Sequence, residues 1–192
     1  MSAQLPTTQL DPTICEQARL TRDARFDGLF FTAVKTTGIY CRPVCPAPTP
    51  KPGNIHYYPS AAAAAAAGYR PCLRCRPEAA PGSPVHRANS ELISAALQMI
   101  EHGALDAGSV GELAARIGVG ERHLRRLFEQ EIGASPNDVA ATRRLLFAKQ
   151  LLLETGLSIT SVAAAAGYAS LRRFNAAFLE AFAKPPRDFR RG

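Results

Sequence analysis

The sequence has no long hydrophobic run, and its longest uniform stretch is seven alanines at residues 61–67. This stretch is too short and too weakly hydrophobic to cross a membrane, which takes about 20 apolar residues. The first ten residues lack the basic and then apolar layout of a secretory signal. With 46% hydrophobic and 20% charged residues, the composition is that of a soluble globular protein. We therefore expect a cytoplasmic protein without a membrane partner, whose thiols stay reduced.

Cysteine is also scarce, and no cysteine follows Cys75 in the chain. Four of the five cysteines form a C-x3-C pair and a C-x2-C pair, namely Cys41, Cys45, Cys72 and Cys75. Two close pairs separated by a folded stretch are typical of a tetrahedral zinc site, and a reducing compartment favours metal over a disulfide. We expect one Zn²⁺ on these four residues. Cys15 lies outside both pairs, and we expect it to be a packed thiol.

Histidine is nearly absent beside these cysteines, because His56 is the only one in residues 1–85. We expect His56 to be a strand residue, so the cysteines have no acid–base partner. The flanking residues are instead basic: Arg42, Arg70, Arg74 and Arg76. A zinc–tetrathiolate centre in a positive field can be structural, or it can serve as a nucleophile toward an anionic substrate. These residues alone leave both readings open.

The formal net charge is +7, and the excess is positive in both halves of the chain. Residues 1–85 carry 9 basic and 5 acidic side chains, and residues 86–192 carry 14 basic and 11 acidic ones. A basic balance in both halves suggests a polyanion as partner, although the signal is weak by itself.

Two regions of different character follow one another. Residues 12–78 mix strand signals, at 29–34 and 55–58, with a short alanine helix that begins after Ser60 and stops at Gly68. A Pro/Gly-rich linker is expected at residues 79–85. Apolar residues at helical spacing then predict helices at 89–103, 109–117, 121–131, 136–154, 158–166 and 170–182.

The helical region contains an internal repeat. Leu113-Ala114-x3-Gly118 reappears as Val162-Ala163-x3-Gly167, and an amphipathic helix follows each copy. A small alanine, a turn glycine and a second helix are typical of the helix-turn-helix motif. The predicted exposed faces of the second helices carry Arg122, His123, Arg125 and Arg126 in the first copy and Arg172, Arg173 and Asn175 in the second. One copy is compatible with an ordinary helical bundle, but two basic copies favour binding of double-stranded DNA in the major groove.

Three segments resemble the N-terminal domain of the Ada family, the methylphosphotriester repair proteins of bacteria. They are Arg22-Asp-Ala-Arg-Phe-Asp-Gly28, Thr36-Thr-Gly-Ile-Tyr-Cys-Arg-Pro-Val-Cys45 and Gly68-Tyr-Arg-Pro-Cys-Leu-Arg-Cys75. The likeness covers residues 12–78. Residues 86–192 resemble the two-unit DNA-binding domain of the AraC family, including Lys184-Pro-Pro186 and Phe189. The resemblance implies an α+β small zinc domain followed by an all-α AraC-type domain with two helix-turn-helix units.

The resemblance also implies an activity. Cys41, the first cysteine of the motif, would irreversibly accept a methyl group from a methylated DNA phosphate, and Cys45, Cys72 and Cys75 would be its companion ligands. Lys35, Arg42, Arg70 and Arg74 would hold the DNA phosphates. The methylated protein would then activate transcription of repair genes as a monomer, with RNA polymerase as a further partner. One departure is Pro48, which stands where family members commonly carry arginine.

Charge arithmetic suggests how methylation could act as a signal. Four thiolates and Zn²⁺ carry −2, and methylation of one sulfur reduces this to −1, which weakens repulsion from DNA. The reading requires Cys41 to be open to solvent with its three partners behind it. Two alternatives stay open: an AraC-type transcription factor with a purely structural zinc site, and a metal or thiol-stress sensor that uses the same cysteines reversibly.

Overall fold

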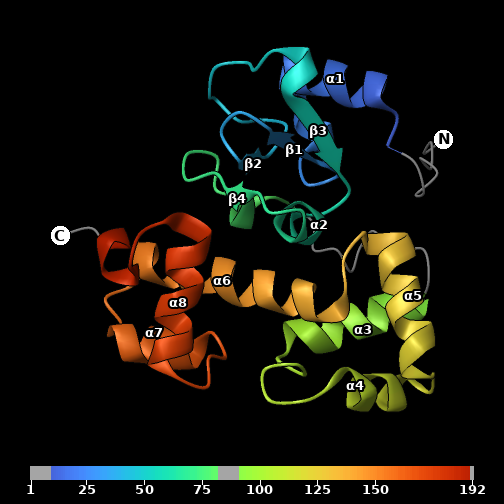
Figure 1. Cartoon of the computed structure of the whole chain (residues 1–192), viewed down its shortest axis with the longest axis vertical. Helices are drawn as coiled ribbons and strands as arrows, with labels where there is room; N and C mark the ends of the chain where they lie inside the picture. The colour runs from blue at the N-terminus through green and yellow to red at the C-terminus, as the bar shows by residue number, and fades with distance from the viewer. Residues whose placement is uncertain (1–9, 82–90, 191–192) are drawn as a thin grey trace.

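The chain folds into two modules that pack against each other (Figure 1). The computed structural model describes residues 10–81, here called the N-terminal module, and residues 91–190, here called the helical module. In these two ranges, none of the helices combines the length and the apolar character needed to traverse a bilayer.

A four-stranded sheet forms the centre of the N-terminal module. Its strands are β1 (Phe31–Val34), β2 (Ile39–Cys41), β3 (Ile55–Tyr58) and β4 (Arg70–Pro71), in the order β3-β1-β2-β4. β1 pairs antiparallel with both β2 and β3, whereas β2 pairs parallel with β4. The predicted strand at 29–34 begins two residues later than expected, and the prediction at 55–58 is confirmed. The two short strands β2 and β4 were not predicted.

Two helices and three short 3₁₀ turns surround the sheet. They are α1 (Pro12–Thr21), α2 (Ala61–Ala66), η1 (Ala24–Phe26), η2 (Pro52–Asn54) and η3 (Pro77–Ala79). α1 was not predicted, although Asp11 caps it and Pro12 stands at its first position. α2 confirms the expected alanine helix, and the Ser60 side chain caps it by accepting from the Ala63 N–H.

The helical module contains the six helices that the apolar spacing predicts. They are α3 (Glu91–Glu101), α4 (Val110–Ile117), α5 (Glu121–Ile132), α6 (Pro136–Glu154), α7 (Ile159–Ala165) and α8 (Leu171–Phe182), followed by η5 (Pro186–Phe189). Residues 89 and 90 of the first predicted helix lie outside the described residues. Capping boxes at Ser109 and Ser135 fix the starts of α4 and α6. Gly118 and Gly133 end α4 and α5 in the left-handed conformation.

α6 runs through the middle of the helical module and joins two separate cores. Val139 and Ala140, near its start, belong to a core shared with α3, α4 and α5. Ala148 and Leu152, near its end, belong to a core with α7, α8 and Phe189. Each half of α6 therefore supports one predicted helix-turn-helix unit.

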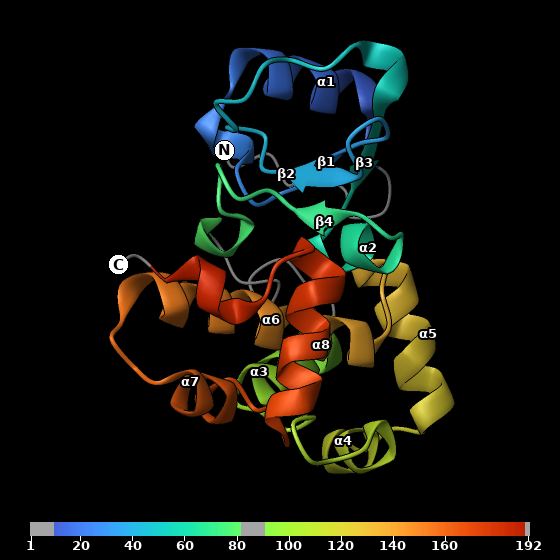
Figure 2. The same ribbon diagram turned by 60° about the vertical axis from the view of Figure 1, so that its left-hand side comes forward.

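The alanine helix α2 lies between the sheet and the helical module (Figure 2). Ala62 of α2 belongs to the same buried cluster as Ile93 and Leu97 of α3. At the C-terminal end of α5, Ser60 Oγ donates to the Ile132 carbonyl at 2.8 Å. A side chain at Gly133 would lie 3.3 Å from the Ala63 methyl group. The small side chains of α2 thus permit the close approach of the two modules.

The first part of the predicted linker packs on the N-terminal module. A side chain at Gly28 would meet the Pro81 carbonyl oxygen at 2.3 Å, and Gly28 also has a φ of +78°. Residues 82–85 of that linker lie outside the described residues. The predicted boundaries of the two domains, 12–78 and 86–192, stay a prediction.

Candidate functional site

The parallel pairing of β2 with β4 brings the two cysteine pairs together. The Arg70 N–H donates to the Gly38 carbonyl at 2.7 Å, and the Cys72 N–H donates to the Tyr40 carbonyl at 3.0 Å. Cys41 ends β2 and Cys72 follows β4, so this ladder sets them side by side. A turn closed by Cys45 N–H to the Arg42 carbonyl, at 3.1 Å, returns the chain to the same place.

The four sulfur atoms of Cys41, Cys45, Cys72 and Cys75, here called the cysteine cluster, lie within 4.8 Å of one another. A tetrahedral zinc with Zn–S bonds of about 2.3 Å requires sulfurs about 3.8 Å apart, so only a small contraction is needed. Four thiolate donors in this arrangement suit zinc in preference to hard cations such as Mg²⁺ or Ca²⁺. The cysteine cluster is a binding site for one zinc ion.

The four cysteines differ in exposure, though not as the sequence suggested. Cys72 and Cys75 are each only 7% exposed, whereas Cys41 and Cys45 are both half-buried. The expectation that Cys41 alone is open, with three buried partners, is therefore wrong for Cys45. Of the four sulfurs, only those of Cys41 and Cys45 belong to residues exposed enough to be candidate nucleophiles.

Hydrogen bonds within the cluster shift the pKa values of its thiols in opposite directions. The bond between the Cys41 and Cys45 thiols lowers the pKa of Cys45 to about 7. Bonds from Cys41 and Cys45 also lower the pKa of Cys72, while the pKa of Cys41 rises because Cys45 and Cys72 stabilise its protonated form. The pKa of Cys75 is raised as well, so Cys45 and Cys72 are the first of the four thiols to give up their protons, as binding of a cation requires.

Backbone N–H groups also reach three of the sulfurs. The Arg42 N–H donates to Cys75 Sγ at 3.4 Å, and backbone hydrogen bonds from Ala47 and Cys75 help to lower the pKa of Cys45 and of Cys72. The contacts that shift the pKa of Cys41 come from the other three cysteines and from burial. Donated N–H groups withdraw charge from a thiolate, so this pattern distinguishes Cys41 from Cys45.

Arg42 braces the two cysteine loops against each other. Its guanidinium pairs with the buried carboxylate of Asp27 and donates to the Cys75 carbonyl at 3.1 Å. Asp27 was not predicted as a site residue, although it precedes Gly28 in one of the segments that carries the resemblance. A DNA contact by Arg42 stays a prediction, but its side chain is already engaged inside the protein.

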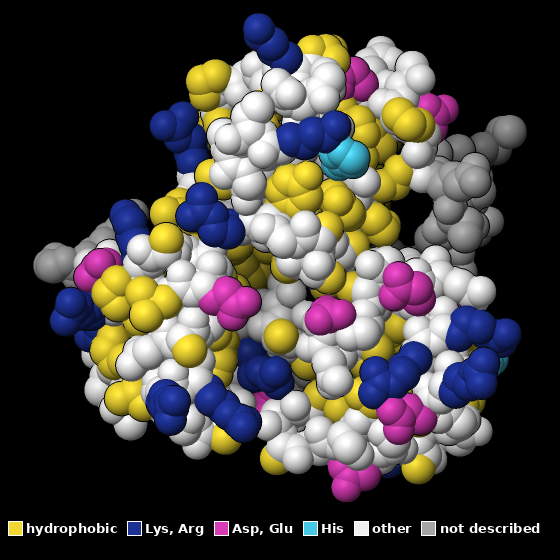
Figure 3. Space-filling model, viewed as in Figure 1, with side chains coloured by type: hydrophobic (Ala, Val, Ile, Leu, Met, Phe, Trp, Pro, Cys, Tyr) yellow, Lys and Arg dark blue, Asp and Glu magenta, His cyan; other side chains and the backbone are white. Residues whose placement is uncertain are grey.

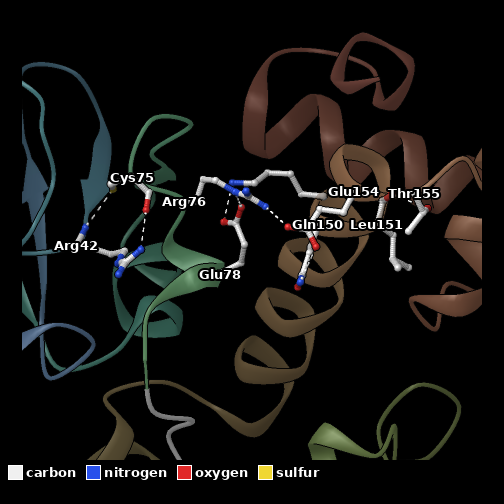
Figure 4. Close-up of polar contacts among 9 residues, drawn as sticks. Arg42, Cys75, Arg76, Glu78, Gln150, Leu151, Glu154 and Thr155 are labelled. Atoms are coloured by element: carbon white, nitrogen blue, oxygen red, sulfur yellow. Dashed lines mark hydrogen bonds and ion pairs between the residues drawn. The ribbon is translucent and has the colours of Figure 1, made fainter. Parts of the chain in front are cut away.

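A second ionic network connects the Cys75 loop to α6 (Figure 4). Arg76 pairs with Glu78 at 3.3 Å and with Glu154, at the end of α6, at 2.6 Å. Glu78 in turn pairs at 2.7 Å with Lys149, whose side chain is fully buried in α6 and lies 5.7 Å from the centre of the Phe182 ring. None of these contacts was predicted, but Lys149 interrupts the apolar stripe of α6, and that interruption was a usable signal.

The other basic residues predicted in this module lie nearer the surface. Lys35 and Arg74 are exposed and Arg70 is half-buried. Lys35 Nζ donates to the Gly53 carbonyl at 3.4 Å.

His56 is an exposed residue of β3, as expected, and Cys15 is buried, with a pKa raised to about 11 mainly by burial. Neither residue belongs to the cysteine cluster.

The helical module presents two helix-turn-helix units, α4–α5 and α7–α8. Each turn contains a left-handed glycine, Gly118 or Gly167, and each second helix is anchored by two buried apolar residues one turn apart. Figure 3 shows Lys and Arg side chains in groups over α5 and over the lower part of the α7–α8 unit. Six of the seven predicted contact residues are exposed, namely Arg122, His123, Arg125, Arg126, Arg172 and Arg173. The seventh, Asn175, is half-buried. Arg125 is partly engaged by Glu121, at 2.7 Å.

A four-cysteine zinc module joined to paired helix-turn-helix units defines a class of metal-dependent DNA-associated proteins. The sequence profile described as the metal binding domain of Ada matches residues 14–78, and the profile described as a helix-turn-helix domain matches residues 113–192. The chain therefore carries an Ada-type metal binding domain followed by a helix-turn-helix domain.

Individual relatives agree with this assignment. The "Probable bifunctional transcriptional activator/DNA repair enzyme AlkA" of Mycobacterium tuberculosis is 44% identical over 84% of this chain and 32% of its own length. The "Bifunctional transcriptional activator/DNA repair enzyme AdaA" of Bacillus subtilis is 29% identical over 91% of this chain and 80% of its own length. The C-terminal domain of AraT, a response regulator from Geobacillus stearothermophilus, matches with 28% identity and a TM-score of 0.50, over 53% of this chain and 84% of that domain. The chain spans about a third of the length of the mycobacterial relative.

Proposed function

We propose that the chain is a DNA alkylation-damage repair and response protein of the cytoplasm. In this proposal Cys41 irreversibly accepts a methyl group from a DNA methylphosphotriester, and the methylated protein activates transcription of repair genes. The observation that carries the proposal is the cysteine cluster, in which the sulfur of the half-buried Cys41, at the end of β2, lies within 4.8 Å of three others. The names of the relatives combine transcriptional activation with DNA repair, and they support both parts of the proposal.

Cys41 is the best nucleophile of the four sulfurs. The burial of Cys72 and Cys75 makes them hard for a DNA backbone to reach, and Cys45 accepts a backbone N–H from Ala47. The nucleophilicity of a thiolate falls as its pKa falls, so Cys41, whose pKa is raised, keeps a more reactive lone pair than Cys45, whose pKa is lowered. Zinc, when bound, holds the four sulfurs deprotonated at neutral pH, so no general base is required.

The transfer is a simple displacement. The Cys41 Sγ lone pair forms a bond to the methyl carbon, and the bond from that carbon to the triester oxygen breaks. The oxygen keeps the electron pair and leaves as part of a phosphodiester anion, and no proton moves. Because a thioether carbon–sulfur bond is not readily hydrolysed, each protein molecule reacts once.

Basic residues around the cluster are suited to hold the DNA backbone. Arg74 is exposed and lies between the ligands Cys72 and Cys75, Arg70 lies two residues before that pair, and Lys35 lies just after β1. Charge-assisted contacts from such residues bind phosphates without reading sequence. We assign Arg42 a bracing role beside its predicted DNA contact, because Asp27 already neutralises its guanidinium.

The two helix-turn-helix units would read promoter DNA. The N-terminal residues of a second helix enter the major groove in this motif, and α5 and α8 carry Arg122, Arg172 and Arg173 there. Methylation of Cys41 removes one negative charge from the cysteine cluster, which reduces repulsion from the same duplex. We further propose that the protein acts as a monomer and recruits RNA polymerase.

Mass analysis of peptides tests the acceptor directly. The zinc-loaded chain is incubated with duplex DNA that carries a methylphosphotriester, and we expect one added methyl group, on Cys41. Cys41→His retains a metal ligand and should bind zinc without accepting a methyl group. Cys45→His is the matched control, because it changes the other half-exposed ligand and should leave Cys41 as acceptor. A methyl group on Cys45, or none on any cysteine, would contradict the assignment, and the second result would favour a structural zinc site.

Comparing the affinities of methylated and unmethylated chain for a selected promoter duplex, over a range of salt concentrations, tests the regulatory half. The charge argument requires tighter binding after methylation and a difference that shrinks as salt increases. Equal affinities at all salt concentrations would rule the switch out while leaving methyl acceptance intact.

A further inference from the structure

Asp106 occupies an unusual position between the two helix-turn-helix units. It lies in the loop between α3 and α4, just before the first unit, and its backbone N–H donates to the Gly103 carbonyl at 2.9 Å. Its carboxylate reaches α6, where Arg143 Nη1 approaches Oδ2 at 3.4 Å and Arg144 Nη1 approaches Oδ1 at 3.3 Å. Arg144 also donates to the neighbouring Leu105 carbonyl at 3.0 Å.

The same carboxylate lies against the turn of the second unit. A side chain at Gly167 would meet Asp106 Oδ2 at 2.2 Å and Oδ1 at 2.7 Å. The corresponding glycine of the first unit, Gly118, has the same left-handed conformation, but no atom of the described residues lies within 4 Å of that position. The absence of a side chain at Gly167 therefore leaves room for Asp106, in addition to permitting the turn.

α6 alone sets the distance between the units but not their relative orientation. Its 19 residues span about 28 Å, and its two halves belong to different cores. A second unit held only through α6 could rotate about the end of that helix. The Asp106 contact supplies a second point of attachment, and two points of attachment restrict such rotation.

We propose that Asp106, held by Arg143 and Arg144, is a positioning residue that fixes the orientation of α8 relative to α5. It thereby determines the spacing of the two DNA boxes that the chain reads. This proposal rests on the proposed function, because it assumes that both units bind one duplex. The three side chains are each only 20–26% exposed, so solvent screens their attraction only in part.

The spacing of two boxes is a sensitive measure of this geometry. Each added base pair moves the second box by about 3.4 Å along the duplex. It also rotates that box by roughly a tenth of a turn, because one helical turn holds 10–10.5 base pairs. Two rigidly held helices cannot follow such a change, whereas two loosely connected units can.

The test uses the zinc-loaded full chain and duplexes that it selects from a random pool. The best duplex is then rebuilt with one base pair inserted or removed between the boxes. We expect the unaltered chain to lose about tenfold or more in affinity with each change, comparable to a mismatched base pair. Asp106→Ala should reduce this loss to about threefold or less, while the preferred sequence of each box is unchanged.

Two controls separate positioning from general damage. Glu91→Gln removes one negative charge from the exposed start of α3 and should keep the spacing profile of the unaltered chain. Gly167→Ala and Gly118→Ala impose the same backbone strain, but only the first displaces Asp106, so only the first should broaden the spacing profile. Circular dichroism of each variant verifies that it is folded.

The outcomes are distinguishable. If folded Asp106→Ala loses as much affinity for duplexes with altered spacing as the unaltered chain does, the positioning role is overturned and the proposed function stands. If the unaltered chain selects only a single box, the premise that both units read one duplex is overturned as well.

Discussion

The buried pair between Lys149 and Glu78 allows a quantitative test of how the modules are joined. Lys149 is fully buried in α6, Glu78 follows the ligand Cys75 by three residues, and their charged atoms are 2.7 Å apart. Removing one partner of a buried pair costs about 3–5 kcal/mol, because the other charge is left without compensation. In Lys149→Met, Arg76 still pairs with Glu78 at 3.3 Å and partly compensates its charge. We therefore expect a smaller loss of unfolding free energy, about 2–3 kcal/mol.

For a chain of this size each kcal/mol lowers the melting temperature by about 2–4 °C. The expected fall for Lys149→Met is therefore about 4–12 °C. Lys184→Met makes the same chemical change at an exposed position and should alter stability by less than about 0.5 kcal/mol. The double variant Lys149→Met/Glu78→Gln removes both charges, and we expect it to be more stable than the sum of the two single changes predicts.

The assay follows helix unfolding by circular dichroism and zinc release with a chromogenic chelator in the same temperature scan. Because Glu78 belongs to the loop that continues from Cys75, loss of the pair should lower the midpoints of both signals. Additive single and double variants would refute the coupling. Zinc release at an unchanged temperature would show that α6 and the cysteine cluster are energetically independent.

Further predictions concern Cys15, Gly28 and Arg122. Burial raises the pKa of Cys15 from 9.0 to about 11, so its alkylation by iodoacetamide at pH 8 should be about 100-fold slower than that of a free cysteine. Because the folded state retains this proton longer than the unfolded chain does, Cys15 should also make stability fall as the pH rises from about 9 to about 11. Gly28→Ala adds a methyl group 2.3 Å from the Pro81 carbonyl oxygen at a positive φ and should lower thermal stability by at least about 1 kcal/mol. Gly53→Ala, whose new methyl group would have no atom of the described residues within 4 Å, should not. Arg122→Ala should reduce the slope of log affinity for DNA against log salt concentration by about 1. Arg25→Ala is the control, because Arg25 is an exposed arginine outside the helical module. Equal slopes for the two variants would argue against a phosphate contact by Arg122.

Local signals account for the parts of the fold that were predicted correctly. The helices of the helical module have apolar residues at helical spacing, serine caps at Ser109 and Ser135, and stop glycines at Gly118 and Gly133. Each of these features acts within one or two turns of chain, so it can be read without knowledge of the rest. The spacing of the cysteines likewise pointed to the four zinc ligands.

Contacts between distant segments account for what was missed. The two residues of β4 are too few to show a strand pattern, and only their parallel pairing with β2 defines the strand. The partners of Arg42, Lys149 and Asp106 come from other parts of the chain, and nothing in the neighbouring residues specifies them. Exposure of Cys45 was also misjudged, because it depends on how the turn from Cys41 closes over the sheet.

The alanine helix has a consequence for anyone who wishes to recombine such proteins. Its methyl groups pack against α6 and the end of α5, so the interface between the two modules tolerates little change in side-chain volume on either side. A chimera that takes its front half from one homologue and its back half from another would have to transplant both surfaces of that interface together. A protein cut in the linker would leave an apolar face bare on each fragment, and we would expect such fragments to stick to each other or to themselves.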